Sequence, residues 1–372
     1  MRSSALAAIT LLAACSPDAD PPKAQAAPAA AAPAPSAASP VTPAAAGGGF
    51  QMAMPIACEV GRTCEVQNYL DLDPGPGVKD YRCAGATYDK HTGVDIRILD
   101  IAAQRRGVDV LAVAPGKVTG VRDEIQDILM NAPGAPPVGA KMCGNGVAID
   151  HGGGWVTQSC HMALGSVRVR PGETVQAGQP IGHVGLSGAT EFPHVHVTVW
   201  KDGKVVDPFA PDATAAAACQ GQASLWTPDA ARQLAYKPGA ILNAGFAAQP
   251  VDMTAIEAGD VSPPTAASPY LIGYVRAINL RGGDQLDIAV RGPGGEVVAN
   301  VTSPAMDRNK AQYFQMVGEA AAGPGVAVRP LHGHDQDPAR RPAGGGADGR
   351  DPPLRVRSRG RRSSRRPRSP PA

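Results

Sequence analysis

Residues Phe192 to Trp200 read FPHVHVTVW, and this stretch determines the fold that the sequence predicts. From His194 onward, valine alternates strictly with other residues, as expected for a β-strand with one buried face. His194 and His196 would then share one face of the strand, and the valines would share the other. In a helix the two histidines would point about 200° apart. The stretch therefore predicts a strand that presents two histidines side by side.

The surrounding sequence is also typical of β structure. Between residues 51 and 213, short β-branched runs such as VLAVAPGKVTGVRD are separated by Pro-Gly, Gly-Gly and Gly-Glu turns. This pattern predicts a mainly β protein, with an antiparallel sandwich-like or barrel-like domain over residues 51–213. Residues 224–320 alternate in the same way and predict a second, small β-sandwich-like module. We expect a short helix around DAARQLA before that module and another around NKAQYFQMV near its end.

The first residues are typical of an export signal. Arg2 precedes the apolar run ALAAITLLAA, which is too short to span a bilayer. The run ends in LAAC, which resembles the lipobox of bacterial lipoproteins. We expect a signal peptide over residues 1–14 and lipidation of Cys15, with an ordinary signal peptide and a chance cysteine as the alternative. Because Ser16 follows the cysteine, the resemblance implies a periplasmic protein, anchored in the outer membrane through its N-terminal lipid.

Both ends of the chain have low sequence complexity. Residues 15–50 are rich in Ala, Pro and Ser and predict a solvated tether, whereas residues 321–372 predict a disordered basic tail. From Arg329 onward the tail carries twelve Arg against four Asp, so the rest of the 372-residue chain, whose overall charge is +2, is acidic. An acidic body lacks the basic surface that binds nucleic acid, and we expect no nucleic-acid partner. The sequence does not define an oligomeric state.

Export makes disulfides the expected state of the cysteines. Apart from Cys15 the chain contains six, which suggest three disulfides among 15 possible connectivities. We predict a local Cys58–Cys64 bridge and a Cys143–Cys160 bridge between neighbouring strands, which leaves Cys83–Cys219. A cysteine zinc site is the alternative, but the spacings lack a paired Cys-x-x-Cys.

A second chemical cluster is HTGVDIRI, residues 91–98, in which apolar residues alternate with Asp95 and Arg97. His91 precedes Asp95 by four positions, which in an extended strand separates the Cα atoms by about 13 Å. Two ligands of one zinc ion, each bound at about 2.1 Å, could hardly span that distance. The chain must therefore bend between them, and Gly93 permits a bend.

Together the two clusters supply His, Asp and His side chains. Catalytic zinc prefers three such ligands, with a fourth position left for water. A further histidine, His161, follows the predicted strand WVTQSC. His332 and His334 lie in the predicted tail.

The order of these motifs carries a family resemblance. The run HTGVD, VLAVAPGKVTGV, GNGVAIDHGGGWVTQSCH, VRVRPGETVQAGQPIGHVGLSG and FPHVHVTV resembles the lysostaphin-like zinc metallopeptidases of bacterial cell walls (peptidase family M23), over about His91 to Pro208. The resemblance implies an antiparallel β domain with its active site in a groove. It also implies one zinc ion held by His91, Asp95 and His196, and catalytic roles for His161 and His194 on either side of the bound water. The residues do not decide which of these two is the base.

Two positions depart from the family pattern. Ser159 stands where the family has an aromatic residue, and either Tyr81 or Tyr88 could match its upstream tyrosine. The chain also has an additional segment between Arg122 and Cys143, expected to form one wall of the groove.

Four other polar residues are interpreted as structural. We expect His151 at a strand-to-turn junction, His183 within a strand, and Asn145 and Asp207 in turns.

The implied function is hydrolysis of peptide cross-links in peptidoglycan by a zinc metalloendopeptidase. One alternative is a catalytically inactive relative that binds the wall or activates an amidase, although such relatives typically lose ligands that this chain retains. Another is a swinging-arm carrier, because PGETVQAGQPIGHVG resembles the strands of biotinyl and lipoyl domains. Those domains need a lysine at a hairpin tip, and no lysine is so placed here.

Overall fold

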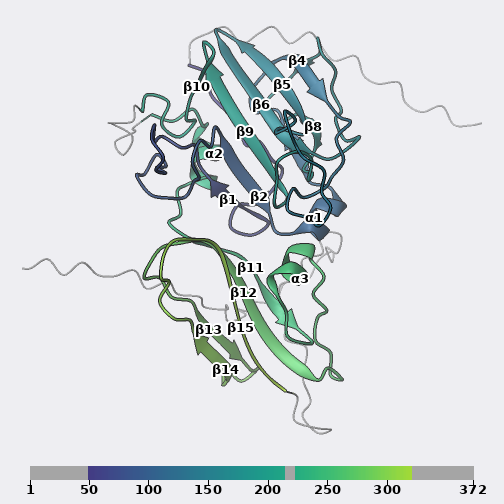
Figure 1. The fold of residues 1–372 in the computed structure, drawn as a ribbon, viewed down its shortest axis with the longest axis vertical. Helices are drawn as coiled ribbons and strands as arrows, with labels where there is room; N and C mark the ends of the chain where they lie inside the picture. Colours follow the sequence, from purple (N-terminus) through teal and green to yellow (C-terminus); the bar gives the residue numbers. More distant parts are fainter. Residues whose placement is uncertain (1–48, 214–222, 321–372) are drawn as a thin grey trace, which may run out of the picture. The chain divides into compact units, whose positions relative to one another are not determined.

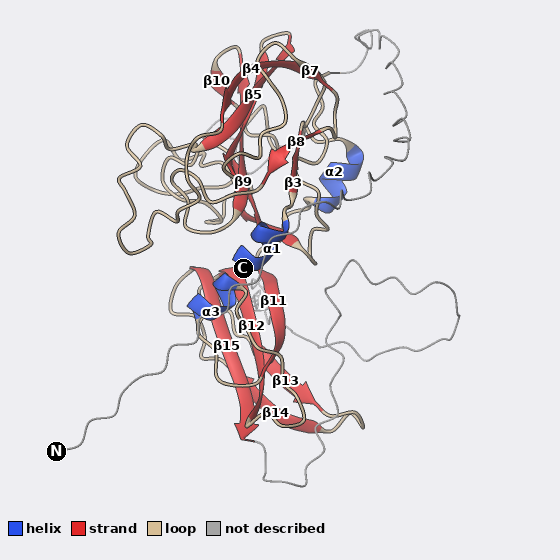
Figure 2. Ribbon diagram, turned by 90° about the vertical axis from the view of Figure 1, so that its right-hand side faces the viewer, coloured by secondary structure: helices blue, strands red, loops and turns tan. Residues whose placement is uncertain are grey.

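The computed structural model describes residues 49–213 and 223–320. The predicted mainly β fold is confirmed, because antiparallel sheets dominate these residues and do not close into a barrel. Figure 2 shows how little helix accompanies the strands. The described helices are α1 (Ile101–Arg106), α2 (Pro228–Gln233) and α3 (Met253–Ala258). None of the described helices is long and apolar enough to cross a membrane.

The largest sheet carries the histidine strand at its centre. Its strand order is β1-β2-β9-β6-β5-β4-β7, with the short β10 paired to β9, and every pairing is antiparallel (Figure 1). Strand β9 therefore has β2 on one side and β6 on the other. The strands are β1 (Cys64–Asn68), β2 (Val94–Ile98), β4 (Gly116–Arg122), β5 (Asn145–Gly152), β6 (Trp155–Met162), β7 (Thr174–Val175), β9 (His194–Lys201) and β10 (Lys204–Val205).

The valine alternation in β9 has the predicted effect. Val195, Val197 and Val199 are buried in the main hydrophobic core together with the alternating apolar residues of β2. Since successive side chains of a strand point to opposite faces, the histidines of β9 and the Asp95 of β2 share the other face. The same core extends to Trp226, just before α2.

The register between strands brings the two sequence motifs together. Asp95 pairs with His196, and Arg97 pairs with His194, across the β2–β9 ladder. On the other side of β9, Cys160 of β6 pairs with His196. A second, two-stranded sheet joins β3 (Asp109–Leu111) to β8 (Pro180–His183), so His183 lies in a strand as predicted.

The residues from Ala240 to Ala320, called here the C-terminal β region, form two more antiparallel sheets. One has the order β11-β12-β15 and the other pairs β13 with β14. Their strands are β11 (Ala240–Ala247), β12 (Tyr270–Leu280), β13 (Asp287–Arg291), β14 (Val297–Thr302) and β15 (Lys310–Ala320). The division of the chain into the predicted domains stays a prediction.

Of the two predicted helices, the one around DAARQLA is present, and the prediction of the other, around NKAQYFQMV, is wrong. Helix α2 begins after Thr227, whose side chain accepts a hydrogen bond from the Ala230 backbone N–H, and it matches the DAARQLA prediction. The NKAQYFQMV stretch is instead part of β15, which pairs with β12 along its whole length. Aromatic and β-branched residues favour a strand wherever a long partner supplies backbone hydrogen bonds, and here β12 is that partner.

Two of the predicted disulfides are present in the structure. Cys58 is bonded to Cys64, and Cys143 is bonded to Cys160. Cys219 and Cys15 lie outside the described residues, as do the predicted signal peptide, tether and basic tail.

Candidate metal centre and its surroundings

Three side chains, one each from β9, β2 and the segment before β2, converge on one point. His91 Nε2, Asp95 Oδ1 and His196 Nδ1 lie 2.8 to 3.2 Å from one another. Tetrahedral ligands bound to zinc at about 2.1 Å would be spaced by about 3.4 Å, which is close to the spacing of these donor atoms. Within the described residues this is the one group of three or more His, Cys, Asp or Glu side chains that could hold a metal ion. The residues therefore fit zinc in both chemistry and spacing.

The chain reaches this geometry through a tight approach at Gly93. The predicted bend lies before β2, where Lys90 adopts a positive φ of 65°, whereas Gly93 is not among the positive-φ residues. A Cβ at Gly93 would lie 2.6 Å from His196 Nε2 and 2.5 Å from the Val197 carbonyl oxygen. Glycine is thus needed here for space rather than for a left-handed turn, which differs from the role that the sequence suggested.

Each of the three donor side chains makes a hydrogen bond through its other polar atom, the one that faces away from the centre. His91 Nδ1 donates to the Tyr69 carbonyl (2.6 Å), and Asp95 Oδ2 accepts from Asn68 Nδ2 (2.8 Å). His196 Nε2 lies 2.9 Å from Thr198 Oγ1 and can donate to it when Nδ1 faces the metal. Such partners hold each ring in one tautomer and direct its free nitrogen to the centre. Thr198 could have been found from its position two residues after His196, but nothing in the sequence indicates Asn68.

The two predicted catalytic histidines flank the cluster. His194 Nε2 lies 3.4 Å from Asp95 Oδ1, while its Nδ1 donates to the Phe192 carbonyl (2.9 Å). His161 Nδ1 donates to the Ser187 carbonyl (2.8 Å), and its ring centre lies 4.7 Å from that of His194. In both rings Nδ1 is occupied as a donor, so Nε2 is the nitrogen that can exchange a proton.

His161 is held in an unusual backbone conformation. Its φ is 60°, a region that residues other than glycine rarely occupy and that is often found at functional sites. The adjacent Cys160 is bonded to Cys143, whose carbonyl accepts a hydrogen bond from the His161 N–H (2.8 Å). The His161 carbonyl in turn accepts from the Gly185 N–H (2.8 Å). The Cys143–Cys160 disulfide therefore braces the backbone of His161, which carries this imidazole.

Burial and charge shift the protonation of these groups in the metal-free protein. Burial by itself would raise the pKa of Asp95, but the neighbouring His91 and His194 hold it well below its usual value. Burial lowers the pKa of His161 well below its usual range, and the charges of His194 and His196 add to the effect. Burial also lowers the pKa of His196, against an opposing contribution from Asp95. The cluster therefore favours an ionised Asp95 and neutral rings at His161 and His196.

The structure distinguishes between the two candidate tyrosines. The Tyr88 ring lies 4.5 Å from the His91 ring and is 53% exposed, and its pKa is raised by burial and by the charges of Asp95 and Glu191. Tyr81 lies instead in an aromatic cluster with Tyr69, Phe209 and Tyr236. Tyr88 is therefore the tyrosine beside the candidate metal centre.

The additional segment between Arg122 and Cys143 lies against the loops that hold the catalytic histidines. Asp127 accepts hydrogen bonds from the Leu164 and Leu186 N–H groups, and the Met130 N–H donates to the Thr190 carbonyl. Asn145 is the first residue of β5, not a turn residue as predicted, and its side chain binds the Ile125 N–H and carbonyl and so anchors this segment.

The remaining predicted polar residues lie apart from the cluster. His151 contacts the Pro115 carbonyl and Thr157, and the Asp207 carboxylate accepts from the Phe209 N–H two residues later. Ser159 is buried within β6.

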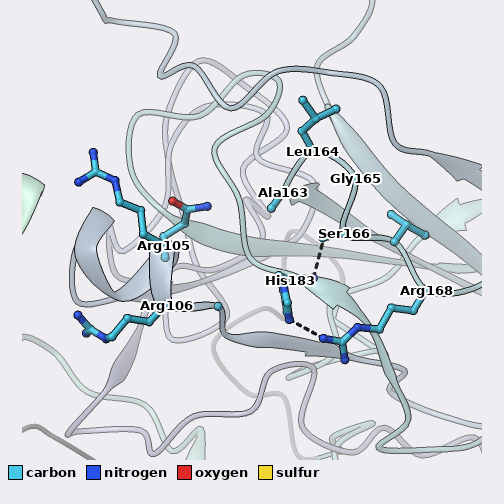
Figure 3. A pocket seen from close by; sticks show the side chains of 11 residues that line it. Arg105, Arg106, Ala163, Leu164, Gly165, Ser166, Arg168 and His183 are labelled. Carbon is cyan, nitrogen blue, oxygen red and sulfur yellow. Dashed lines mark hydrogen bonds between the residues drawn. The ribbon is translucent and has the colours of Figure 1, made fainter. Parts of the chain in front are cut away.

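A cavity of about 450 Å³ also lies apart from the donor set. It is lined by the end of α1, the loop from Ala163 to Arg168, and His183 (Figure 3). His183 is engaged there by Arg168 and Asp109. None of the five candidate zinc-binding and catalytic residues lines this cavity.

Comparison with known proteins identifies the family of the central part of the chain. Residues 89–208 match the model of peptidase family M23, which confirms the predicted family over that stretch. Among solved structures, the chain is similar to a mutant catalytic domain of the prophage-encoded M23 protein EnpA from Enterococcus faecalis (23% identity, 45% of this chain and 100% of that one, TM-score 0.30). It is also similar to the catalytic domain of lysostaphin from Staphylococcus simulans (22% identity, 38% and 85%, TM-score 0.25). A zinc-containing peptidase from Vibrio cholerae matches at 23% identity with a TM-score of 0.25, and 38% of each chain is covered.

Proposed function

We propose that this chain, whose residues 89–208 belong to peptidase family M23, is a zinc metalloendopeptidase that hydrolyses peptide cross-links of bacterial peptidoglycan. The family match supports a peptidase that acts on the bacterial cell wall. The proposal adds the zinc dependence, the substrate and the residues that carry the reaction.

One observation carries the proposal. His91, Asp95 and His196 direct three donor atoms to a common point, and two further histidines border that point, each with its Nδ1 engaged by a backbone carbonyl. An inactive relative that only binds the wall would not need the complete set. A purely structural zinc site would have four protein ligands and no bordering bases.

The chemistry divides between the ion and the histidines. When bound, zinc polarises the scissile carbonyl and lowers the pKa of the attacking water towards 7. Of His161 and His194, one neutral ring accepts the proton of the attacking water at Nε2, and the other, when protonated, donates a hydrogen bond to the developing oxyanion. The carbonyls of Ser187 and Phe192 hold the two rings in the tautomer that these roles require.

Tyr88 is proposed to contact the substrate. Its ring borders His91, and half of its surface is exposed, so its hydroxyl can donate a hydrogen bond to a bound peptide. Because the pKa of this phenol is raised, the hydroxyl keeps its proton at neutral pH.

We also propose that the protein acts in the periplasm, attached to the outer membrane through Cys15. The sequence supports this through its predicted signal peptide and its LAAC stretch. The disulfides of the described region suit an oxidising compartment.

The test uses the chain without its first 15 residues, purified with its disulfides intact and loaded with zinc. Isolated peptidoglycan is incubated with it, with and without a chelator, and the released fragments are analysed by mass spectrometry. We expect fragments cleaved at a peptide cross-link, whose masses identify the bond. Release should stop with the chelator and with His196→Ala.

The matched control is His183→Ala, which removes a histidine outside the cluster and should leave cleavage intact. Cleavage that persists in His196→Ala would contradict the zinc mechanism. If the folded, zinc-loaded protein released nothing but co-sedimented with peptidoglycan, the inactive wall-binding relative would replace the proposal.

A further inference from the structure

The side chain of Arg97 is completely buried on the face of the sheet that carries the candidate metal centre. It lies on β2 two residues after Asp95, and its register partner on β9 is His194. A buried guanidinium is costly unless a counter-charge accompanies it. The identity of that counter-charge therefore matters to the neighbouring histidine.

The counter-charge comes from the C-terminal β region. Glu257 of α3 accepts two hydrogen bonds from Arg97 Nη2, at 2.8 and 3.0 Å. The same carboxylate also accepts from Arg276 of β12, which is fully buried and donates to the Leu99 carbonyl just after β2. Leu99 packs against Leu242 and Ile278 of the same region. One carboxylate thus forms ion pairs with two buried arginines.

On its other side, Arg97 supports the residues that hold His194. The Arg97 guanidinium carbon lies 4.3 Å from the centre of the Phe192 ring, a cation–π contact. The Phe192 ring centre lies 4.7 Å from that of His194, and the Phe192 carbonyl accepts the His194 Nδ1–H bond. A continuous line of contacts therefore leads from α3 to a catalytic imidazole.

We propose that Glu257, Arg97 and Phe192 are positioning residues through which the C-terminal β region fixes the His194 ring. This inference rests on the proposed function and gives the C-terminal region a role in it. Glu257 holds the guanidinium over the Phe192 ring, and the ring keeps the 192 carbonyl where it can orient His194. We call the line of contacts from Glu257 through Arg97 to Phe192 the relay. The backbone N–H of Ile98 donates to the Pro193 carbonyl and so anchors the segment that carries Phe192. Loss of the relay should therefore shift the His194 ring without releasing this segment.

The decisive variants change the relay at two different points. Phe192→Leu removes the aromatic face but leaves every buried charge paired, and Phe192→Tyr restores that face. Glu257→Gln removes the counter-charge and leaves two buried arginines unpaired, so it also tests whether the protein still folds. Lys310→Met is the matched control, because it breaks another ion pair of the C-terminal β region, that with Asp307, and removes no group of the Glu257, Arg97 and Phe192 contacts.

A displaced catalytic group costs turnover rather than binding, and a misplacement of about 1 Å can cost about 100-fold. We expect kcat to fall about 10- to 100-fold in Phe192→Leu and Glu257→Gln, with KM within about twofold and zinc content unchanged. Phe192→Tyr should recover most of kcat relative to Phe192→Leu. Lys310→Met should keep kcat even if it lowers the melting temperature.

A second measurement does not depend on activity. The Nδ1–H proton of His194, held by the Phe192 carbonyl, should give a slowly exchanging imidazole resonance in the NMR spectrum of the zinc-loaded protein, assigned by its loss in His194→Gln. It should broaden or vanish in Phe192→Leu and Glu257→Gln and persist in Lys310→Met. Wild-type protein that cleaves nothing yet shows this pattern would overturn the proposed function and leave the relay supported. An unchanged resonance and unchanged kcat in Phe192→Leu would overturn the relay.

Discussion

Asp95 of β2 and His196 of β9 are register partners in neighbouring strands, and the His196 Nδ1 and Asp95 Oδ1 atoms lie 2.8 Å apart. Strand pairing therefore places two of the three donors, and the segment before β2 adds His91. The rigidity of the centre comes from the sheet, while its precision comes from the hydrogen bonds behind each donor.

Removal of the support behind Asp95 should weaken zinc binding. In Asn68→Ala the Asp95 carboxylate loses the hydrogen bond that turns Oδ1 towards the centre. We expect zinc affinity to fall about 10- to 100-fold, as measured by competition with a chromogenic chelator. Asn300→Ala, on an exposed position of β14, is the control and should bind zinc as the wild type does. Equal affinities for all three proteins would contradict this role of Asn68.

Gly93 should tolerate no side chain. In Gly93→Ala the added methyl would lie within 2.6 Å of His196 Nε2 and of the Val197 carbonyl, and the backbone cannot yield as a flexible side chain would. We expect a loss of about 1–3 kcal/mol in the free energy of unfolding and impaired zinc binding. Gly120→Ala, whose methyl would be 3.8 Å from its nearest neighbour, should cost far less. Denaturant unfolding of both variants decides between these expectations.

Zinc binding and catalysis should be separable. His161→Ala and His194→Ala should retain zinc, because neither ring is part of the three-donor set, but should reduce kcat by about 10²- to 10⁴-fold through loss of proton transfer or oxyanion stabilisation. Metal analysis and cleavage assays on the same preparations provide the measurement. Loss of zinc from His194→Ala would instead show that this ring is a ligand.

The two disulfides should differ in their effect on activity. Replacement of Cys143 and Cys160 by Ser opens a loop of 17 residues and should cost about 3 kcal/mol of stability. It should also reduce kcat, because the bridge braces the strained backbone of His161. The Cys58–Cys64 bridge closes a loop of 6 residues away from the centre, so its double Ser variant should keep kcat. Similar activities for the two double variants would contradict the bracing role.

Asp207 should make the protein less stable as the pH rises. Burial raises its pKa from 3.8 to about 7, and one of its carboxylate oxygens has no hydrogen-bond partner among the described residues. The folded state therefore keeps a proton that the unfolded chain releases above its lower pKa. The resulting stabilisation is complete below about pH 4 and is lost as the pH rises to about 7, by up to about 4 kcal/mol.

Asp207→Asn tests this by removing the titrating proton. Denaturant unfolding between pH 4 and 8 should show a shallower decline for the variant than for the wild type. Parallel curves would mean that Asp207 does not titrate differently in the folded and unfolded states.

The direction of a side chain could be predicted from the sequence where the local periodicity is clear. The valines of β9 placed His194 and His196 on one face, and the spacing of His91 and Asp95 required a bend, both without knowledge of any partner strand. Prediction was weakest for β15, whose NKAQYFQMV stretch was predicted as a helix. Its conformation is determined by the long antiparallel partner β12, which is remote in sequence.

The mainly β class, the donor types and the strand that presents the histidines could be predicted from the sequence, because these depend on residues within a few positions of one another. The three-dimensional fold was needed to show that Asp95 and His196 are register partners, that Asn68 and the Tyr69 carbonyl hydrogen-bond the donor side chains, and that Glu257 forms the ion pair with Arg97. These contacts join segments up to 160 residues apart. Their register depends on which strands bury their apolar faces together, and a slip of one residue would turn every donor to the opposite face of the sheet.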